Sequence, residues 1–315
     1  MTKPLYLHSS WRSSSTYVWA KFRTDPKAYC YFEPMAEHLR AATPDVLGGV
    51  SWSYAHHPPL DVPYRAEFLP LLDPVDGIRG FPGTGPYVRY RLEPGDEAPE
   101  WERYFQVLTA YAESQGRYPV FGLVRSSLRV GWFRAHLEGV HVYIQRHPRP
   151  QFLSMLRQQS LGTSYFVERG AVILGNNWDD PLLAPVRERV GLPAYDGPPE
   201  GRDDFYRAYA GGCGIPALYA VFYYLHRLAA LRLDGACDLV LDVDDIARDP
   251  MARDQAQRRL AALTGVDVSF SDCHPESYED LIRGDVAEAR FHPVEREMDD
   301  LLTEVVSRQD RCGYS

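Results

Sequence analysis

Hydroxyl side chains beside an arginine follow the first apolar run of the chain. That run is Pro4-Leu5-Tyr6-Leu7, and the segment Arg12-Ser13-Ser14-Ser15-Thr16 ends where a helix-compatible pattern starts at Tyr17. A loop between a strand and a helix presents unpaired backbone N–H groups and the positive end of the helix dipole. A helix cap needs only one or two hydroxyls. We therefore predict a phosphate or sulfate site at residues 12–16.

The loop lacks the signature of nucleotide triphosphatases. The pattern GxxxxGK[ST] needs glycine and a lysine before Ser or Thr, and residues 8–16 contain neither. Residues 8–21 instead resemble the 5′-phosphosulfate loop of sulfotransferases that use 3′-phosphoadenosine 5′-phosphosulfate (PAPS), commonly written [PR]-[KR]-S-G-[TS]-[TS]. Ser14 stands where that family has glycine. Arg12 stands where cytosolic members have lysine, although protein-tyrosine sulfotransferases and many bacterial relatives also have arginine there.

Two later segments extend the resemblance. The family holds the 3′-phosphate with an arginine at a strand end and a serine eight positions on, and residues 146–154 repeat this as R-x-P-R-x-x-x-x-S, from Arg146 to Ser154. Residues 241–246, followed by Asp249-Pro250, are similar to a late strand segment of the family. The three segments stand in family order and cover most of the chain.

The resemblance implies a role for each matching residue. Arg12 would contact the bridging and 5′-phosphate oxygens, and its role would be electrostatic because arginine stays protonated at neutral pH. Ser13, Ser14, Ser15 and Thr16 would donate hydrogen bonds to the phosphate. Arg146 and Ser154 would hold the 3′-phosphate.

The general base has two candidates. Sulfotransferases use a histidine or a glutamate, and several groups place the glutamate just after the second strand, which is where Glu33 stands. His57, in the aromatic and proline-rich segment 52–59, is the second candidate. His8 ends the first predicted strand and is interpreted as a structural histidine.

A second loop repeats the logic of the first. Arg125-Ser126-Ser127-Leu128-Arg129 follows a strand and opens a predicted helix. It could bind the acceptor or the nucleotide, and a plain helix cap explains it equally well.

The elements that must position these residues alternate between strand and helix. Strands are predicted at 4–7, 28–32, 119–124, 140–144 and 239–241, and helices at 35–42, 100–116, 126–137, 182–190, 215–233 and 250–264. Such alternation predicts an α/β fold with a parallel sheet covered on both faces. Ligands bind at the carboxyl ends of the strands in such sheets. The resemblance implies the central parallel sheet of P-loop nucleotide triphosphatases.

We expect a single domain over residues 1–315. Segments at about 50–99 and 162–213 are rich in glycine and proline and show little periodicity. They are interpreted as loop-rich inserts that form the acceptor pocket. Their aromatic content indicates an apolar or aromatic small molecule.

Composition limits the partners and the setting. The chain has 315 residues and a net charge of −9, which argues against nucleic acid as its main partner. The five cysteines have no CxxC spacing, so we expect a reducing, cytoplasmic setting and no metal site. The sequence indicates neither a signal peptide nor a membrane span. It carries no signal for the oligomeric state.

These observations predict a PAPS-dependent sulfotransferase that transfers a sulfuryl group to a hydroxyl or amine of a small molecule. One alternative is a non-catalytic protein of the same fold that binds an anionic ligand. Another is a phosphotransferase that uses ATP, against which the missing lysine argues.

Overall fold

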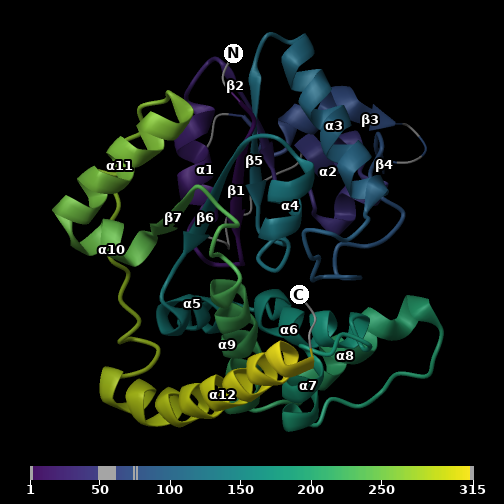
Figure 1. Cartoon of the computed structure of the whole chain (residues 1–315), viewed down its shortest axis with the longest axis vertical. Coiled ribbons are helices and arrows are strands. Elements are labelled where there is room, and N and C mark those ends of the chain that lie inside the picture. Colours follow the sequence, from purple (N-terminus) through teal and green to yellow (C-terminus); the bar gives the residue numbers. More distant parts are fainter. Residues whose placement is uncertain (1–2, 49–61, 74, 76, 313–315) are drawn as a thin grey trace. The chain divides into compact units, whose positions relative to one another are not determined.

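The computed structural model describes residues 3–48, 62–73, 75 and 77–312. The chain divides into two compact units (Figure 1). The first consists of Met1–Pro86, Arg91–His147 and Arg232–Pro275, and the second of Tyr87–Tyr90, Pro148–Leu231 and Glu276–Ser315. The expected single domain stays a prediction.

Five parallel strands form the sheet of the first unit. They are β1 (Leu5–Ser9), β2 (Ala28–Phe32), β5 (Tyr118–Leu123), β6 (Val140–Gln145) and β7 (Leu239–Asp242). The order across the sheet is β2-β5-β1-β6-β7, and each neighbouring pair is parallel. Every residue of β1, β2 and β5 is buried, as expected for a sheet covered on both faces. The predicted α/β fold is confirmed.

Alternate strand residues point into two different cores. Leu5 and Leu7 of β1 belong to a core with α1 (Ser15–Arg23), α10 (Val243–Arg248) and α11 (Pro250–Thr264). Tyr6 points the other way, into a largely aromatic core with α3 (Pro99–Ser114) and α4 (Val130–His136). This period of two places helices on both faces (Figure 1).

The glycine at position 122 lets α1 approach the sheet. A Cβ atom at Gly122 would lie only 2.9 Å from Cδ1 of Trp19, whose side chain is fully buried. Only glycine at position 122 leaves room for this indole. Helix α1 therefore packs directly against β5.

The chain changes direction across the sheet between β1 and β6. From β1 the chain continues to β2 on one side, and from β6 it continues to β7 on the other. Where the connections from two adjacent strands run in opposite directions, a crevice forms at the carboxyl ends of those strands, and ligands of α/β proteins bind there. Arg12 follows β1 and Arg146 follows β6, so both arginines flank this switch point.

Smaller elements complete the first unit. They are the 3₁₀ helices η1 (Glu37–Ala41) and η3 (Ala66–Leu71), helix α2 (Pro44–Gly48), and the antiparallel pair β3 (Leu72–Asp73) and β4 (Gly77–Ile78). The predicted helix at 35–42 is therefore a short 3₁₀ helix. The helix predicted from residue 126 begins only at Val130, because residues 124–129 form a loop held by side chains.

The second unit is helical. It contains α5 (Pro148–Ser160), α6 (Tyr165–Asn176), α7 (Ala184–Val190), η4 (Pro199–Gly201), α8 (Arg202–Gly211), α9 (Ile215–Leu231) and α12 (Gly284–Cys312). The helix predicted at 182–190 is confirmed as α7, but the rest of the loop-rich interpretation of 162–213 is wrong, because α6 and α8 fill much of that segment. Gly175 is not a helix breaker but a packing residue: a Cβ atom there would lie 1.9 Å from Cε2 of Tyr206.

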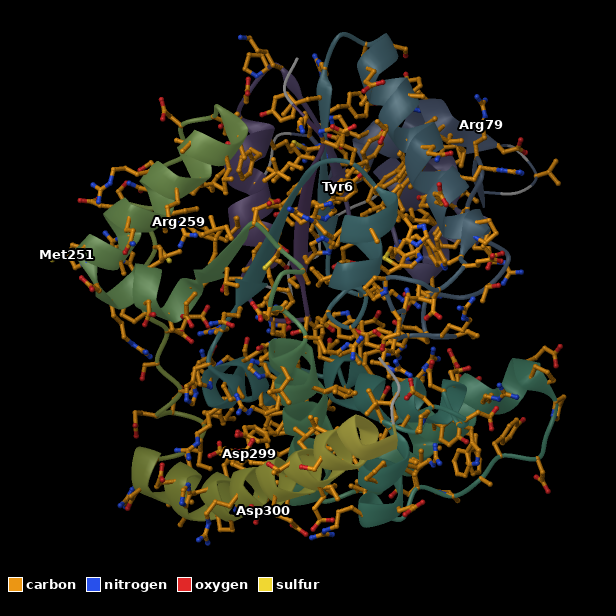
Figure 2. All side chains as sticks on the ribbon, in the orientation of Figure 1. Tyr6, Arg79, Met251, Arg259, Asp299 and Asp300 are labelled. Atoms are coloured by element: carbon orange, nitrogen blue, oxygen red, sulfur yellow. The ribbon has the colours of Figure 1, made fainter. Side chains whose placement is uncertain are left out.

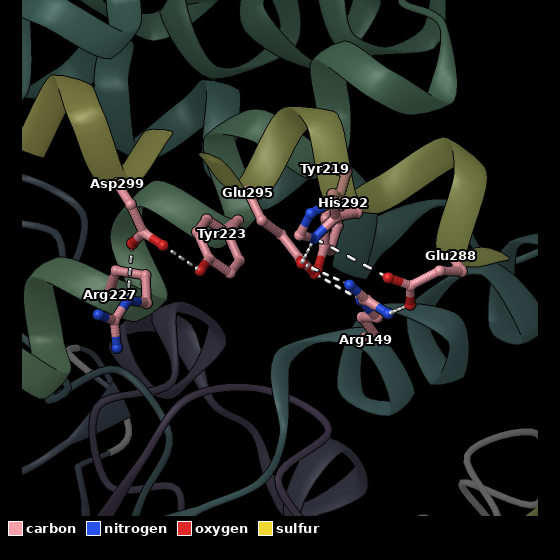
Figure 3. A network of polar contacts seen from close by, with 8 residues as sticks. All are labelled: Arg149, Tyr219, Tyr223, Arg227, Glu288, His292, Glu295 and Asp299. Atoms are coloured by element: carbon pink, nitrogen blue, oxygen red, sulfur yellow. Dashed lines mark hydrogen bonds and ion pairs between the residues drawn. The ribbon is translucent and has the colours of Figure 1, made fainter. Parts of the chain in front are cut away.

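Carboxylates on one face of α12 bind this helix to α5 and α9 (Figure 3). Arg149 of α5 donates from Nε and Nη2 to the two oxygens of Glu295, at 2.7 and 2.6 Å. Tyr219 of α9 donates to the same carboxylate at 2.6 Å. Farther along, Tyr223 and Arg227 both donate to Asp299 at 2.9 Å. Arg149, although part of the 146–154 motif, is therefore neutralised by α12.

The segment Tyr87–Tyr90 is fixed to α6 of the second unit. The backbone N–H of Tyr90 donates to Oδ1 of Asn177 at 2.7 Å, and Nδ2 of Asn177 donates to the carbonyl of Tyr87 at 2.7 Å.

Figure 2 shows the side chains of both units, with Tyr6 beside the sheet and Met251 and Arg259 on α11. Among the helices described, none is long and apolar enough to cross a membrane.

Candidate functional site

The loop after β1 has an unusual backbone. Arg12 and Ser14 adopt φ angles of 63° and 64°, in the left-handed region. Residues other than glycine rarely occupy this region, and those that do cluster at functional sites. Ser14 adopts a conformation that glycine takes without strain.

Three of the hydroxyl-bearing residues, Ser14, Ser15 and Thr16, stand at the start of α1. Ser13 donates to the carbonyl of Ser10 at 2.8 Å. Ser14 is the N-terminal cap residue of α1, yet its side chain makes no capping hydrogen bond, and the first turn has no acidic residue. Within the part of the chain that the structure describes, the hydroxyls of Ser14, Ser15 and Thr16 make no hydrogen bond. Backbone and side-chain donors thus meet at one helix start, which suits an anion.

A buried ion pair orients Arg146 at the end of β6. Its Nε donates to Oδ1 of Asp244 at 3.3 Å, and the other oxygen of Asp244 accepts from the N–H of His147 at 2.8 Å. Both ionic side chains are less than 10% exposed. Asp242 caps α10 by accepting from the N–H groups of Asp244 and Asp245. The segment 241–246 therefore positions Arg146, a role that the sequence did not reveal.

Ser154 lies on α5 in the second unit and is buried. Arg146 belongs to the first unit, so the pairing of Arg146 with Ser154 stays a prediction. Gln151 and Gln158 lie on the same side of this helix as Ser154 and are also buried.

Glu33 follows β2 and extends the sheet by one hydrogen bond. Its N–H donates to the carbonyl of Gly122 at 3.0 Å, and its φ angle is 49°. Oε2 lies 3.1 Å from Nη1 of Arg125 and 3.6 Å from Nη2 of Arg65. The other oxygen, Oε1, accepts no hydrogen bond from the residues described. Two guanidinium groups therefore lie beside this carboxylate, and Arg125 donates a hydrogen bond to one of its oxygens.

Arg125 joins three strand-end loops. Besides Glu33, it donates from Nη2 to Oε2 of Glu37 at 2.8 Å. Its guanidinium lies 5.5 Å from the centre of the Trp11 ring, in the loop after β1. The side chain is only 2% exposed. The loops after β1, β2 and β5 are thus tied together through one buried arginine.

The strand-end cluster of Glu33, Glu37, Arg65, Arg125 and His38 has balanced charge. Burial alone would raise the pKa of Glu33, but the guanidinium groups of Arg125 and Arg65 outweigh it, and the pKa lies below its ordinary value. Burial, followed by the charge of Arg65, lowers the pKa of His38 to about 4. Two carboxylates thus face two guanidinium groups beside a neutral imidazole, and Glu33 stays ionised at neutral pH.

The remaining residues to be placed are His57, Arg65 and His8. His57 lies outside the residues that the structure describes. Arg65 was missed because it lies in a segment without periodicity, and only its proximity to Glu33 identifies it. His8 is a buried structural histidine: its Nδ1 lies 3.0 Å from Oγ of Ser126, and its Nε2 lies 3.0 Å from Nδ1 of His141.

Comparison of the chain with protein-family models found no match, and comparisons with curated proteins and with solved structures found none either. Within the described residues, no group of three or more His, Cys, Asp or Glu side chains is arranged to hold a metal ion.

Proposed function

We propose that the protein is a PAPS-dependent sulfotransferase that acts on a small molecule. The observation that carries the proposal is the loop after β1, where Arg12 and Ser14 adopt left-handed backbone angles beside the uncapped start of α1. The strand order supports it, because β1 stands centrally between β5 and β6, as in P-loop-like sheets. The resemblance of residues 8–21 supplies the chemical identity of the anion.

The residues present suit a nucleotide that carries two separate anionic groups. Arg12 and residues 13–16 would hold the 5′-phosphosulfate, and the hydroxyls of Ser14, Ser15 and Thr16 make no other hydrogen bond in the part of the chain described. Arg146 and Ser154 would hold the 3′-phosphate. Asp244 supports this use of Arg146 because it fixes the guanidinium through Nε. When bound, PAPS supplies the sulfuryl group, and no metal is part of the proposal.

The transfer needs in-line geometry and charge stabilisation. The acceptor oxygen or nitrogen forms a bond to sulfur while the bond from sulfur to the bridging oxygen breaks. The leaving 3′-phosphoadenosine 5′-phosphate keeps that electron pair. Arg12 stabilises the charge on the leaving oxygens and cannot give up a proton. The acceptor loses its proton to a base.

Glu33 is the favoured base. Its oxygen Oε2 lies beside Arg125 and Arg65, and Oε1 accepts no hydrogen bond within the described part of the chain. A carboxylate of lowered pKa is a weak base, but it is ionised whenever the acceptor binds. Group transfers with loose transition states need little help from a base before the leaving bond breaks. His57 remains the second candidate.

The acceptor is proposed to be an apolar or aromatic small molecule with a hydroxyl or amine. The inserts at 50–99 and 162–213 would shape its pocket. A cytoplasmic setting is part of the proposal, and Cys30, Cys213, Cys237 and Cys273 are free thiols.

Isothermal titration with 3′-phosphoadenosine 5′-phosphate tests the donor site. We expect binding without added magnesium and weaker binding of adenosine 5′-phosphosulfate, which lacks the 3′-phosphate. Arg146→Ala should weaken binding by about 2 to 3 kcal/mol, or roughly 100-fold. Arg259→Ala, which removes an exposed arginine of α11, is the control and should change nothing. Absence of binding at millimolar nucleotide would overturn the proposal.

Turnover distinguishes an enzyme from a binding protein of the same fold. PAPS and a panel of phenols, alcohols and amines should release 3′-phosphoadenosine 5′-phosphate. Glu33→Gln should lower kcat by roughly 100-fold or more and leave nucleotide binding within twofold of the wild-type value. Unchanged turnover in Glu33→Gln would assign the base to His57. Magnesium-dependent binding of ATP in place of PAPS would favour the phosphotransferase.

A further inference from the structure

A chain of buried side chains lies beneath the loop after β5 and is not used by the proposed chemistry. It consists of Ser126, His8 and His141, none more than 1% exposed. Oγ of Ser126 lies 3.0 Å from Nδ1 of His8, and Nε2 of His8 lies 3.0 Å from Nδ1 of His141. Nε2 of His141 lies 3.0 Å from the carbonyl oxygen of Leu137. Complete burial rules out Ser126 as a nucleophile in this conformation.

The direction of each hydrogen bond that links Ser126, His8 and His141 follows from the last acceptor, the carbonyl of Leu137. The carbonyl of Leu137 can only accept, so His141 donates from Nε2, and its Nδ1 is an acceptor in the neutral ring. His8 must then donate from Nε2, which leaves its Nδ1 to accept the hydroxyl proton of Ser126. Burial lowers the pKa of both histidines and keeps the rings neutral. One arrangement of protons satisfies all four groups.

Rigid packing fixes the position of the two rings. The ring centre of Tyr6 lies 4.7 Å from that of His141, with the planes 5° apart, and 6.3 Å from that of His8. Phe133 of α4 packs against the edge of His8 at 5.1 Å. The hydroxyl of Ser126 is therefore held by rings that belong to the aromatic core rather than by a mobile side chain.

The loop from which Ser126 donates this hydrogen bond lacks regular structure. Residues 124–129 lie between the end of β5 and the start of α4, so no ladder of backbone hydrogen bonds fixes them. The backbone carbonyl of Ser126 accepts from the N–H of Arg129 at 2.8 Å, and Ser126 directly follows Arg125. The position of the Arg125 backbone depends on how firmly Ser126 is held.

We propose that Ser126, His8 and His141 are positioning residues, which hold the loop after β5 so that Arg125 keeps the Glu33 carboxylate oriented. They touch no reacting atom and act through Arg125. Without the histidines, the only other acceptor recorded for Ser126 is the carbonyl of Leu123, at 3.3 Å. The inference rests on the proposed function only for its effect on turnover, because the Arg125–Glu33 ion pair can be measured by itself.

The test compares variants that break the chain with one that preserves it. Ser126→Ala removes the first donor, and His141→Leu removes the acceptor for His8. His141→Gln retains an acceptor and a donor without a titratable ring. Carbon-13 NMR of the Glu33 carboxyl reports the ion pair, since loss of a guanidinium contact raises a buried carboxyl pKa by about 1 unit or more. We expect that rise in Ser126→Ala and His141→Leu, and wild-type titration in His141→Gln.

A control variant separates positioning from lost stability. Thr264→Val removes another buried hydroxyl, which donates to the carbonyl of Leu260 at 2.8 Å, and should leave the Glu33 titration unchanged. A folded Ser126→Ala with wild-type Glu33 titration would overturn the proposal.

The wild-type protein alone offers a second measurement if the variants fail to fold. Nitrogen-15 NMR should find both rings neutral and protonated at Nε2 at pH 6. A proton on Nδ1 of either ring would overturn the inferred direction and the proposal with it. If the protein binds no nucleotide, the proposed function fails while these NMR results still decide the positioning role. If it does turn over, kcat should fall in Ser126→Ala and recover in His141→Gln, with little change in nucleotide affinity.

Discussion

Acid should destabilise the protein through its buried histidines. His141 is 1% exposed, and burial lowers its pKa from 6.5 to about 4. Between these values the unfolded chain binds a proton at this residue and the folded chain does not. Stability therefore falls as the pH falls from about 6.5 towards 4. His8, whose pKa is lowered by burial and by the nearby His141, adds to the loss in the same direction.

The size of the effect follows from the two pKa values of His141. The free energy of unfolding changes by RT times the logarithm of the ratio of the unfolded and folded proton-binding polynomials. With pKa values of 6.5 and about 4, this gives a loss of about 2 kcal/mol between pH 7 and pH 5. A loss of that size is a large share of the stability of an ordinary domain.

Urea unfolding at pH 7, 6 and 5 measures the loss, with the wild type and His141→Gln compared at each pH. The variant should lose about 2 kcal/mol less than the wild type between pH 7 and pH 5. Thr264→Val should lower stability by a constant amount at every pH because it removes no titratable group. Equal pH dependence in the wild type and His141→Gln would refute the reasoning, since it would mean that the ring is charged in the folded protein.

Three further substitutions test other parts of the structure. Gly122→Ala should lower the free energy of unfolding by about 1 to 3 kcal/mol, because the added methyl meets the indole of α1, whereas Gly95→Ala, with open space around it, should be nearly neutral. Ser14→Gly should raise thermal stability by about 1 kcal/mol because it relieves a left-handed backbone. Asp244→Ala should cost about 3 to 5 kcal/mol in urea unfolding because it leaves Arg146 buried without its carboxylate.

The strands could be predicted because each is a short apolar run whose residues are adjacent in the sequence. The five apolar runs became five parallel strands, and Tyr6 between Leu5 and Leu7 shows how one strand serves two cores. The loop at residues 12–16 was equally visible, because its hydroxyls and arginine are adjacent in the sequence. The left-handed backbone at Ser14 could not be predicted, because a serine is expected to have a negative φ angle.

The contacts within the site needed the topology. Glu33 and Arg125 were each recognisable as strand-end residues, but their ion pair depends on β2 and β5 being neighbours. Arg65 comes from an aperiodic segment and could not be connected to Glu33 by any spacing rule. Helices α6 and α8 of the segment 162–213 were hidden by glycines such as Gly175, where tertiary packing overrides a low helix propensity.

The order of the strands has a consequence for synthesis of the chain. β1, β2, β5 and β6 are complete once residue 145 has been made, but β7, which pairs with β6, comes only at residues 239–242. Until then the outer edge of β6 has no strand beside it, while the long helical stretch from α5 to α9 is still emerging. An unpaired edge invites pairing with another chain. The period between residues 145 and 242 is thus the stage of synthesis at which a chaperone would be of most use to the nascent protein.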